Sequence, residues 1–159
     1  MTYSKKRNII LATIIFLLGI LAGGKIINEE QHLKNVNLFL VNGVIDGDTI
    51  KLANKKKVRL LGINSPEKGE CFYNQGRDDL RDLILNKKVK LEKDITDQDI
   101  YGRWLRYVIL EKENGDNLLV NDWLVRQGLA FDISSAPNNR YRNLLASAEE
   151  EAKREKRGL

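Results

Sequence analysis

An apolar run near the N-terminus is the feature that most limits what this chain can fold into. The run covers residues 9–22, Ile-Ile-Leu-Ala-Thr-Ile-Ile-Phe-Leu-Leu-Gly-Ile-Leu-Ala, and the bases Lys5, Lys6 and Arg7 precede it. A helix of this composition is apolar on every side, whereas a helix on the surface of a soluble domain keeps a polar face. The run therefore separates residues 1–27 from the rest of the 159-residue chain, which is long enough for one domain.

Two functions fit this N-terminal segment. If residues 23–27 extend the run and Lys25 turns its amine toward the headgroups, the segment reaches the ~20 residues that span a bilayer. A basic leader before a short apolar run is also typical of a secretory signal peptide, and small residues at 22–24 offer a cleavage site. A buried helix of the globular domain is a third interpretation, which the flanking bases disfavour. We favour an anchor that enters the membrane through residues 9–27.

The position of the bases predicts how the chain is placed. Because positive residues stay on the cytoplasmic side of a membrane, the rest of the chain is expected outside the cytoplasm. It would be anchored there, or secreted if the segment is cleaved. We expect residues 1–27 to be a membrane anchor or signal peptide, residues 28–36 a polar linker, and residues 37–159 one folded domain.

Most of the net positive charge of the chain lies in the same segment. Residues 1–27 carry four bases and no acid, and without those four the 27 bases of the chain fall to 23, against 22 acids. A nearly neutral remainder predicts no broad basic surface. Any attraction to the phosphates of a nucleic acid therefore depends on where single Lys and Arg residues lie.

Two residue counts narrow the chemistry. The chain has one cysteine, Cys71, which excludes an intramolecular disulfide framework and a cysteine-rich zinc site. Its one histidine, His32, excludes HExxH zinc chemistry and two-histidine zinc fingers. A serine–histidine–aspartate triad would need this histidine, which lies in a polar stretch near the N-terminus. We expect chemistry that rests on carboxylates, arginines and an oxygen-liganded metal.

From residue 37 onward, short apolar segments alternate with turns. Strands are expected at residues 37–45, 49–52, 58–63, 89–92 and 104–110, and helices at residues 75–85, 118–127 and 138–156. Five short strands, with one helix among them and two at the end, predict an α+β fold rich in β-barrel. An open antiparallel sheet packed on helices is the alternative, which strand counting does not separate from a barrel.

Four short motifs carry side chains suited to phosphate chemistry. Asp46-Gly47-Asp48-Thr49 places two carboxylates on a tight turn, which suits a hard divalent cation, although Asp-Gly is also a common turn dipeptide. Arg59 offers a planar donor fork from an apolar strand. Glu67 follows Asn64-Ser65-Pro66 at a strand end, where a general base could lie. Asp99-Ile100-Tyr101-Gly102-Arg103 adds a second arginine beside an aromatic ring. Each motif alone is also an ordinary turn, strand residue or loop.

In this order, the motifs resemble the staphylococcal nuclease (thermonuclease) family. The matching stretches are Ile45–Ile50, Val58–Glu67, Tyr101–Arg103, Leu124–Ala130, Pro137–Asn139 and Glu151–Lys156. The resemblance extends from about Phe39 to Gly158. It implies an OB-fold, a five-stranded barrel with three helices, and a hydrolase that cleaves phosphodiester bonds in DNA and/or RNA with Ca²⁺.

The resemblance also implies a metal site. Asp48 matches a Ca²⁺-binding carboxylate, Asn64 occupies the second acidic ligand position, and Ser65 occupies a position that contributes a backbone carbonyl. Many family members have Asp where this chain has Asn64. An amide oxygen binds Ca²⁺, but one negative charge is lost, so we expect weaker Ca²⁺ binding and tolerance of other divalent cations.

The same resemblance implies the catalytic residues. Glu67 matches the residue described as general base or water-positioner, and Arg59 and Arg103 match the two arginines that hold the phosphate and its developing charge. Tyr101 is the expected stacking surface for a nucleic-acid base. Residues 131–136 lack the tyrosines that pack around a nucleotide in the best-known member, which affects terminal-nucleotide binding but not the catalytic centre.

Two further classes of function stay open. The change at Asn64 allows a non-catalytic nuclease-like OB module that binds nucleic acid or protein, since OB barrels serve many binding roles. An envelope protein whose anchor matters more than its barrel is the third possibility. The sequence implies no obligate protein partner.

Overall fold

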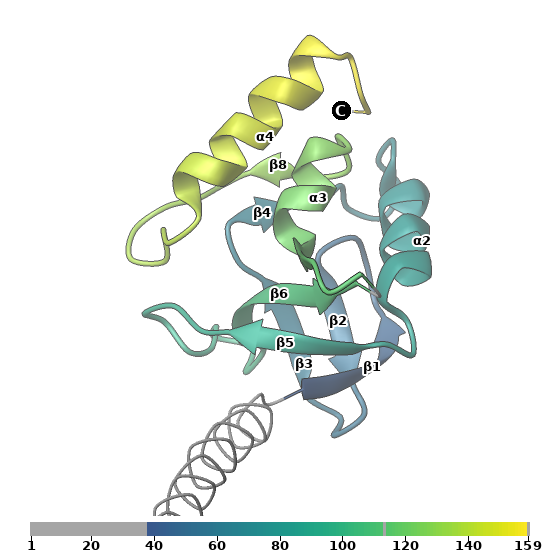
Figure 1. The fold of residues 1–159 in the computed structure, drawn as a ribbon, viewed down its shortest axis with the longest axis vertical. Helices are drawn as coiled ribbons and strands as arrows, with labels where there is room; N and C mark the ends of the chain where they lie inside the picture. Colours follow the sequence, from purple (N-terminus) through teal and green to yellow (C-terminus); the bar gives the residue numbers. More distant parts are fainter. Residues whose placement is uncertain (1–37, 113, 159) are drawn as a thin grey trace, which may run out of the picture. The chain divides into compact units, whose positions relative to one another are not determined.

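The computed structural model describes residues 38–112 and 114–158 (Figure 1). The expected N-terminal hydrophobic helix, whether anchor or signal peptide, and the linker at residues 28–36 lie outside the described residues. Within residues 38–112 and 114–158, no helix is long and apolar enough to cross a membrane.

Five strands close into a barrel. They are β1 (Leu38–Val44), β2 (Thr49–Leu52), β3 (Lys57–Leu60), β5 (Lys88–Glu92) and β6 (Trp104–Glu111). Their order is β3-β2-β1-β5-β6, and β3 returns to pair with β6 in parallel, with Val58 opposite Trp104. The other barrel pairs are antiparallel. The closed, mixed, OB-like barrel confirms the expected architecture, and the open antiparallel sheet is excluded.

Alternation along the strands explains the barrel core. In β2, Ile50 and Leu52 are buried while Lys51 between them is exposed, and in β3 Val58 and Leu60 are buried. Successive strand side chains point to opposite faces, so the apolar set of each strand enters the same interior. Burial of this apolar surface is the main force that holds the strands together.

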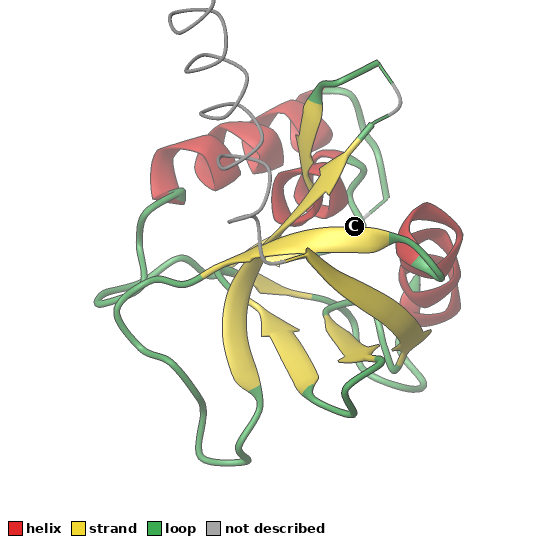
Figure 2. Cartoon of the chain, turned by 60° about the horizontal axis from the view of Figure 1, so that its bottom comes forward, coloured by secondary structure: helices red, strands yellow, loops and turns green. Residues whose placement is uncertain are grey.

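Three helices gather at one end and side of the barrel (Figures 1 and 2). They are α2 (Tyr73–Ile84), α3 (Val120–Arg126) and α4 (Arg142–Arg154). Each adds buried side chains at helical spacing to the one core: Leu80 and Ile84, Val120 and Leu124, and Leu145 and Ala148. Two short strands, β4 (Ile63–Asn64) and β8 (Phe131–Asp132), pair with each other beside the helices. A third, β7 (Asn117–Leu119), pairs antiparallel with β6.

Several expected element boundaries were wrong by two residues or more, and the structure gives the reason for three of them. The strand expected at residues 58–63 ends at Leu60, because Gly62 adopts a positive φ of 74° in a turn. The helix expected from residue 118 begins at Val120, since Leu118 pairs with Leu110 as part of β7. The last helix begins at Arg142 and not at Asn138, whose side chain accepts a hydrogen bond from the backbone N–H of Thr96.

Candidate active site

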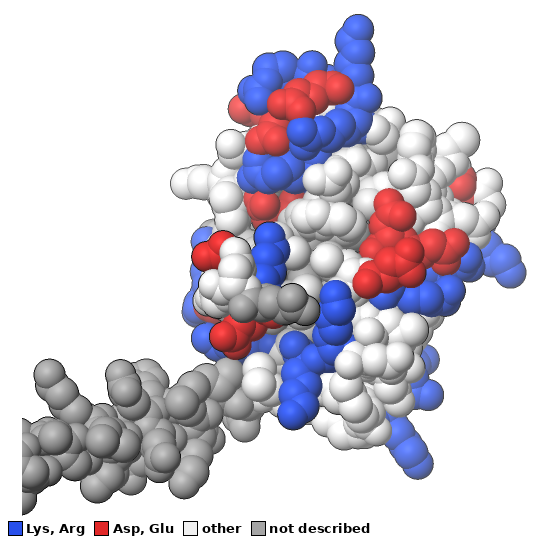
Figure 3. Space-filling view, turned by 45° about the vertical axis from the view of Figure 1, so that its right-hand side comes forward, with Lys and Arg blue, Asp and Glu red and all other residues white. Residues whose placement is uncertain are grey.

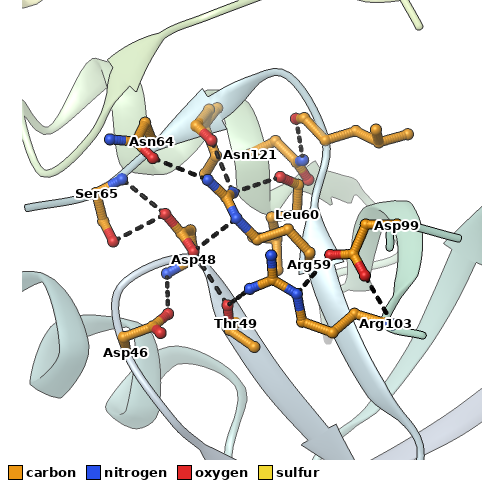
Figure 4. A network of polar contacts seen from close by, with 12 residues as sticks. Asp46, Asp48, Thr49, Arg59, Leu60, Asn64, Ser65, Asp99, Arg103 and Asn121 are labelled. Atoms are coloured by element: carbon orange, nitrogen blue, oxygen red, sulfur yellow. Dashed lines mark hydrogen bonds and ion pairs between the residues drawn. The ribbon is translucent and has the colours of Figure 1, made fainter. Parts of the chain in front are cut away.

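Asp48 is the centre of the candidate site. It follows the tight turn between β1 and β2, where its backbone N–H donates to Oδ1 of Asp46 at 3.1 Å. The residue is 5% exposed. Its Oδ2 accepts hydrogen bonds from the backbone N–H and the hydroxyl of Ser65, at 2.8 and 3.0 Å, and its Oδ1 accepts one from Thr49 at 3.1 Å (Figure 4). These bonds fix both carboxylate oxygens.

Arg59 lies on β3 and points its guanidinium at the same place. Its Nε is 3.0 Å from Oδ1 of Asp48, and Nη2 donates to Oδ1 of Asn64 at 3.0 Å. Nη1 donates to the backbone oxygens of Leu60 and Ile63, at 2.8 and 2.7 Å. The arginine therefore joins the turn before β2 to strand β4 in a single orientation.

Burial disfavours the charged forms of both Asp48 and Arg59. Burial raises the pKa of Asp48, and the attraction of Arg59 and the hydrogen bonds from Ser65 oppose that rise. Burial lowers the pKa of Arg59, and the attraction of Asp48 opposes that change. Each charge is thus stabilised by the other, which is expected of an ion pair removed from water.

Arg103 lies at the edge of the group, just before β6. Its Nε donates to Oδ2 of Asp99 at 2.6 Å, and its backbone N–H donates to Oδ1 of the same carboxylate. Nη1 reaches the hydroxyl of Thr49 at 3.4 Å, and that hydroxyl donates to Asp48. Asp99 therefore orients the arginine from the Nε side and leaves the outer Nη groups only weakly engaged.

Tyr101 and Glu67 are both exposed. The ring of Tyr101 is 77% exposed, and the guanidinium of Arg103 lies 5.5 Å from its centroid. Glu67 follows the buried Ser65 and Pro66, and its backbone N–H donates to the carboxylate of Glu70 at 2.6 Å. Its negative charge tends to raise the pKa of Arg59. In the described part of the chain its carboxylate has no hydrogen-bond partner.

The structure thus brings together five of the seven expected site residues. Asp48, Arg59, Asn64 and Ser65 are hydrogen-bonded to one another, and Arg103 joins them through Thr49. Glu67 and Tyr101 lie in adjoining loops without such a bond to this group. We refer to Asp48, Arg59, Asn64, Ser65 and Arg103 as the site cluster.

The oxygen atoms around Asp48 are of the type that a hard cation prefers, but together they carry little negative charge. Asp46 and Asp48 supply carboxylate oxygens and Asn64 an amide oxygen, which are ligands that Ca²⁺ prefers. Among the described residues, no group of three or more Asp, Glu, His or Cys side chains could hold a metal ion. Both oxygens of Asp48 already accept protein donors, so a cation bound to this carboxylate would compete with Arg59 and Thr49 at Oδ1 or with Ser65 at Oδ2.

A cleft of about 250 Å³ opens beside the two arginines. Arg59 and Arg103 line one part of it, with Asp99, and Ile133 and Ser135 line another. Ile133 and Ser135 come from the stretch that lacks tyrosines, and Ile133 is 52% exposed. A small ligand with a phosphate toward the arginines and an apolar part toward Ile133 suits this lining.

The site includes three supporting residues that the sequence analysis did not assign. Asp99 and Thr49 orient Arg103, as described above. Asn121, fully buried on α3, donates to the backbone oxygen of Leu61 at 2.8 Å and accepts from the N–H of Val108 at 2.9 Å. It ties the turn after β3 to β6. The four-residue spacing of Asp99 and Arg103 was a usable signal, but a lone Asn in an amphipathic helix gives none.

Charge elsewhere on the surface is mixed. Figure 3 shows Lys and Arg side chains interleaved with Asp, Glu and uncharged ones over the face that it draws. This agrees with the nearly neutral balance of the sequence outside residues 1–27. The local basic feature that faces a cleft is therefore the pair Arg59 and Arg103.

Comparison with known proteins shows the family of this chain. The model of the staphylococcal nuclease homologue family matches residues 57–159. A thermonuclease of Staphylococcus hyicus is 31% identical over 142 residues, which are 82% of this chain and 81% of that protein. A thermonuclease of Staphylococcus intermedius is 35% identical over 125 residues, 73% of this chain and 71% of that protein. Endonuclease YncB of Bacillus subtilis strain 168 is 32% identical over 139 residues, 81% of this chain and 64% of that protein. Because the family model covers more than half of the chain, including Arg59, Asn64 and Arg103, the chain belongs to the staphylococcal nuclease family.

Proposed function

We propose that this chain is a metal-dependent, Ca²⁺-type endonuclease that hydrolyses phosphodiester bonds in DNA and/or RNA. The family and its thermonuclease and endonuclease relatives support a nuclease. The observation that carries the proposal is the buried Asp48–Arg59 pair, which fixes one arginine at a cleft that Arg103 also lines.

The two arginines would bind and stabilise the phosphate. Guanidinium groups offer parallel N–H donors that match phosphate oxygens, and their charge is most valuable where negative charge grows in the transition state. Arg103, whose Nη groups have one long contact of 3.4 Å, would donate first. Arg59 would hold the phosphate in register from its fixed orientation.

Glu67 would activate the water. Its carboxylate is exposed and would accept a proton from a water molecule as that water attacks phosphorus. The bond from phosphorus to the leaving ester oxygen then breaks, and that oxygen takes up a proton from solvent. A carboxylate that has no hydrogen-bond partner within residues 38–112 and 114–158 suits this step.

A divalent cation fits the site through Asp48 and Asn64, with the backbone oxygen of Ser65. When bound, it would neutralise phosphate charge and favour attack on phosphorus. The affinity of the cation for this site would be low, because Asn64 is neutral and Arg59 already forms an ion pair with Asp48. We therefore propose weak Ca²⁺ binding with tolerance of other divalent cations.

The test is cleavage of single-stranded DNA and RNA by the full chain, with Ca²⁺ or with chelator. Glu67→Gln should lower the metal-dependent rate by roughly 10²–10⁴-fold. Glu150→Gln, the same change at an exposed residue of α4, should leave the rate unchanged. A folded chain that cleaves neither substrate with any divalent cation contradicts the proposal.

A binding module is the second candidate, and the bond from Arg59 to the neutral Asn64 favours it. In such a module, Arg59 stays bonded to the protein and no metal is recruited. Binding of nucleic acid that Arg103→Ala weakens, with no cleavage in any metal, would support this function.

We also propose that residues 9–27 tether the nuclease to the membrane, with the folded domain outside the cytoplasm. The basic leader and the apolar run support this placement. In cells, the full-length protein should stay with the membrane fraction and be digested by protease added outside. A shortened protein in the medium would show instead that the segment is cleaved.

A further inference from the structure

One side of the barrel sheet carries leucines and lysines that none of the three described helices covers. Leu38 and Leu40, on β1, are 45% and 42% exposed. Lys90 pairs directly with Leu38, and Lys88 with Leu40, so these four side chains project from the same face of the sheet. Both lysines are exposed.

The same row continues across the sheet. Ile109 lies opposite Lys90, and Leu119 lies opposite Ile109, and both are half-buried. The row therefore contains one residue from each of four strands: Leu38 of β1, Lys90 of β5, Ile109 of β6 and Leu119 of β7. In Figure 1, α3 and α4 lie above the barrel strands and α2 lies beside them, while β1 is at the lower edge of the domain. We call Leu38, Leu40, Lys88, Lys90, Ile109 and Leu119 the β1–β5 face.

More positive charge adjoins this face. The backbone N–H of Ala53 donates to the oxygen of Leu40 at 2.9 Å, which places the turn between β2 and β3 beside β1. That turn carries Lys55 and Lys56, and Lys57 begins β3; all three are exposed. Aliphatic side chains with lysines among and beside them suit the boundary of an anionic lipid layer, where acyl chains meet headgroup phosphates.

The chain length outside the structure points to the same partner. Ten residues, and therefore eleven Cα–Cα steps, separate Ile27, the end of the apolar segment, from Leu38, the first residue of β1. Fully extended, they reach at most about 40 Å. A domain of this size has a radius of gyration of only about 14 Å. A tether of that length, attached where the β1–β5 face begins, keeps the face close to the membrane at high effective concentration.

We propose that the β1–β5 face docks on the anionic membrane surface and so orients the tethered domain. The proposal rests on the membrane tether of the proposed function. The leucines and Ile109 would enter the headgroup boundary, and Lys88 and Lys90 would bind lipid phosphates. Docking would hold the domain by a face that contains none of the site cluster residues, which leaves the cleft to the nucleic acid.

The experiment uses the full chain in vesicles, with Cys71→Ser to remove the exposed native thiol. An environment-sensitive dye is attached through Leu40→Cys, and in a control through Lys156→Cys, beyond α4. Vesicles contain either phosphatidylcholine alone or equal parts of phosphatidylcholine and phosphatidylglycerol. With phosphatidylglycerol, the dye at position 40 should shift to the blue and be quenched by lipid-attached nitroxide, and the control dye should stay accessible to iodide.

Charge reversal tests the lysines. Lys88→Glu with Lys90→Glu should abolish the blue shift, since each lysine removed lowers the docked population about fivefold. Arg154→Glu with Lys156→Glu, the same charge change beyond the face, should leave it intact. If the variant with Lys88→Glu and Lys90→Glu does not fold, the response of the dye at position 40 to the two lipid compositions still tests the proposal.

The outcomes separate this proposal from the tether. A chain that floats with vesicles while the dye at position 40 stays in water keeps the tether and overturns docking. A chain absent from the vesicle fraction overturns both. Protection from iodide without quenching by the lipid nitroxide overturns docking too, because protein and not lipid then covers the face.

Discussion

Nε of Arg59 lies 3.0 Å from Oδ1 of Asp48, and the two side chains are only 14% and 7% exposed. The pair links the turn before β2 to β3 and, through the other donors of Arg59, to Ile63 and Asn64. A fixed guanidinium at the cleft thus depends on a buried carboxylate. The two groups form one structural unit as well as a candidate catalytic one.

Asp48→Asn should destabilise the domain strongly. The amide keeps the size of the carboxylate but leaves Arg59 buried without a counter-charge, which costs about 3–5 kcal/mol when one partner of a buried pair is removed. Urea denaturation of the variant measures this loss. Asp46→Asn is the control, since Asp46 caps the same turn through one backbone N–H. Equal losses from the two variants would contradict the special role of the pair.

The sequence predicted the strands well because strand alternation is a local signal. Residues 49–52 form β2 as expected, and the apolar positions of β3 enter the core. Closure of the barrel could not be read from the strand pattern, because the parallel pairing of Val58 with Trp104 joins residues 46 positions apart. The resemblance to a known family supplied it. Leu118 fits a helix locally, and its pairing with β6 overrides that preference.

The site was predictable in its residue types and less so in its contacts. Asp48, Arg59, Asn64 and Ser65 lie together as the resemblance implied. The four-residue spacing of Asp99 and Arg103 was a signal for their contact, but the contact itself depends on a loop that folds the carboxylate back on the arginine, and such a loop follows neither a helix nor a strand period.

Asn64→Asp should tighten Ca²⁺ binding by at least roughly tenfold. At about 4 Å a unit charge pair is worth about 1 kcal/mol even in water, and a divalent cation doubles that. Nη2 of Arg59 already donates to this side chain, so the carboxylate is tolerated in place. Calorimetric titration with Ca²⁺ measures the change, with Asn64→Leu expected to bind more weakly than the native chain. Unchanged affinity in both variants would remove Asn64 from the ligand set.

Tyr107 should make the domain sensitive to alkali. Its side chain is fully buried, and burial, aided by the charge of Asp94, raises its pKa to about 12. In the unfolded chain, the hydroxyl of this tyrosine ionises near pH 10. The folded state holds this proton more tightly, so the stabilisation is complete below about pH 10 and is lost as the pH rises toward 12.

The free energy of unfolding, followed by urea denaturation across this window, should fall less steeply in Tyr107→Phe than in the native chain. The variant should stay folded, because the bond from the hydroxyl to Asp94 is long, at 3.4 Å. Tyr101→Phe, at an exposed ring, is the control and should follow the native curve. Parallel curves for all three proteins would show that Tyr107 does not titrate in this range.

Gly62→Ala should disrupt the packing of α4. Gly62 has a φ of 74°, and a Cβ there would lie 2.7 Å from Cδ1 of Leu145 and 3.0 Å from the hydroxyl of Ser134. Gly102→Ala is a matched control, because Gly102 has a φ of 75° and no heavy atom within 4 Å of a Cβ. Both changes carry the left-handed strain of about 1–2 kcal/mol. Overpacking adds about 1–3 kcal/mol at Gly62 alone.

Chemical denaturation should therefore rank native chain, Gly102→Ala and Gly62→Ala in order of decreasing stability. Gly62 also sits directly before Ile63, whose backbone oxygen accepts from Arg59 at 2.7 Å. A shift of this turn moves that acceptor, so Gly62→Ala should also slow any cleavage under conditions where the variant is still folded. Equal stability of the two variants would mean that Leu145 yields to the added methyl, and that α4 is not held against the turn after β3.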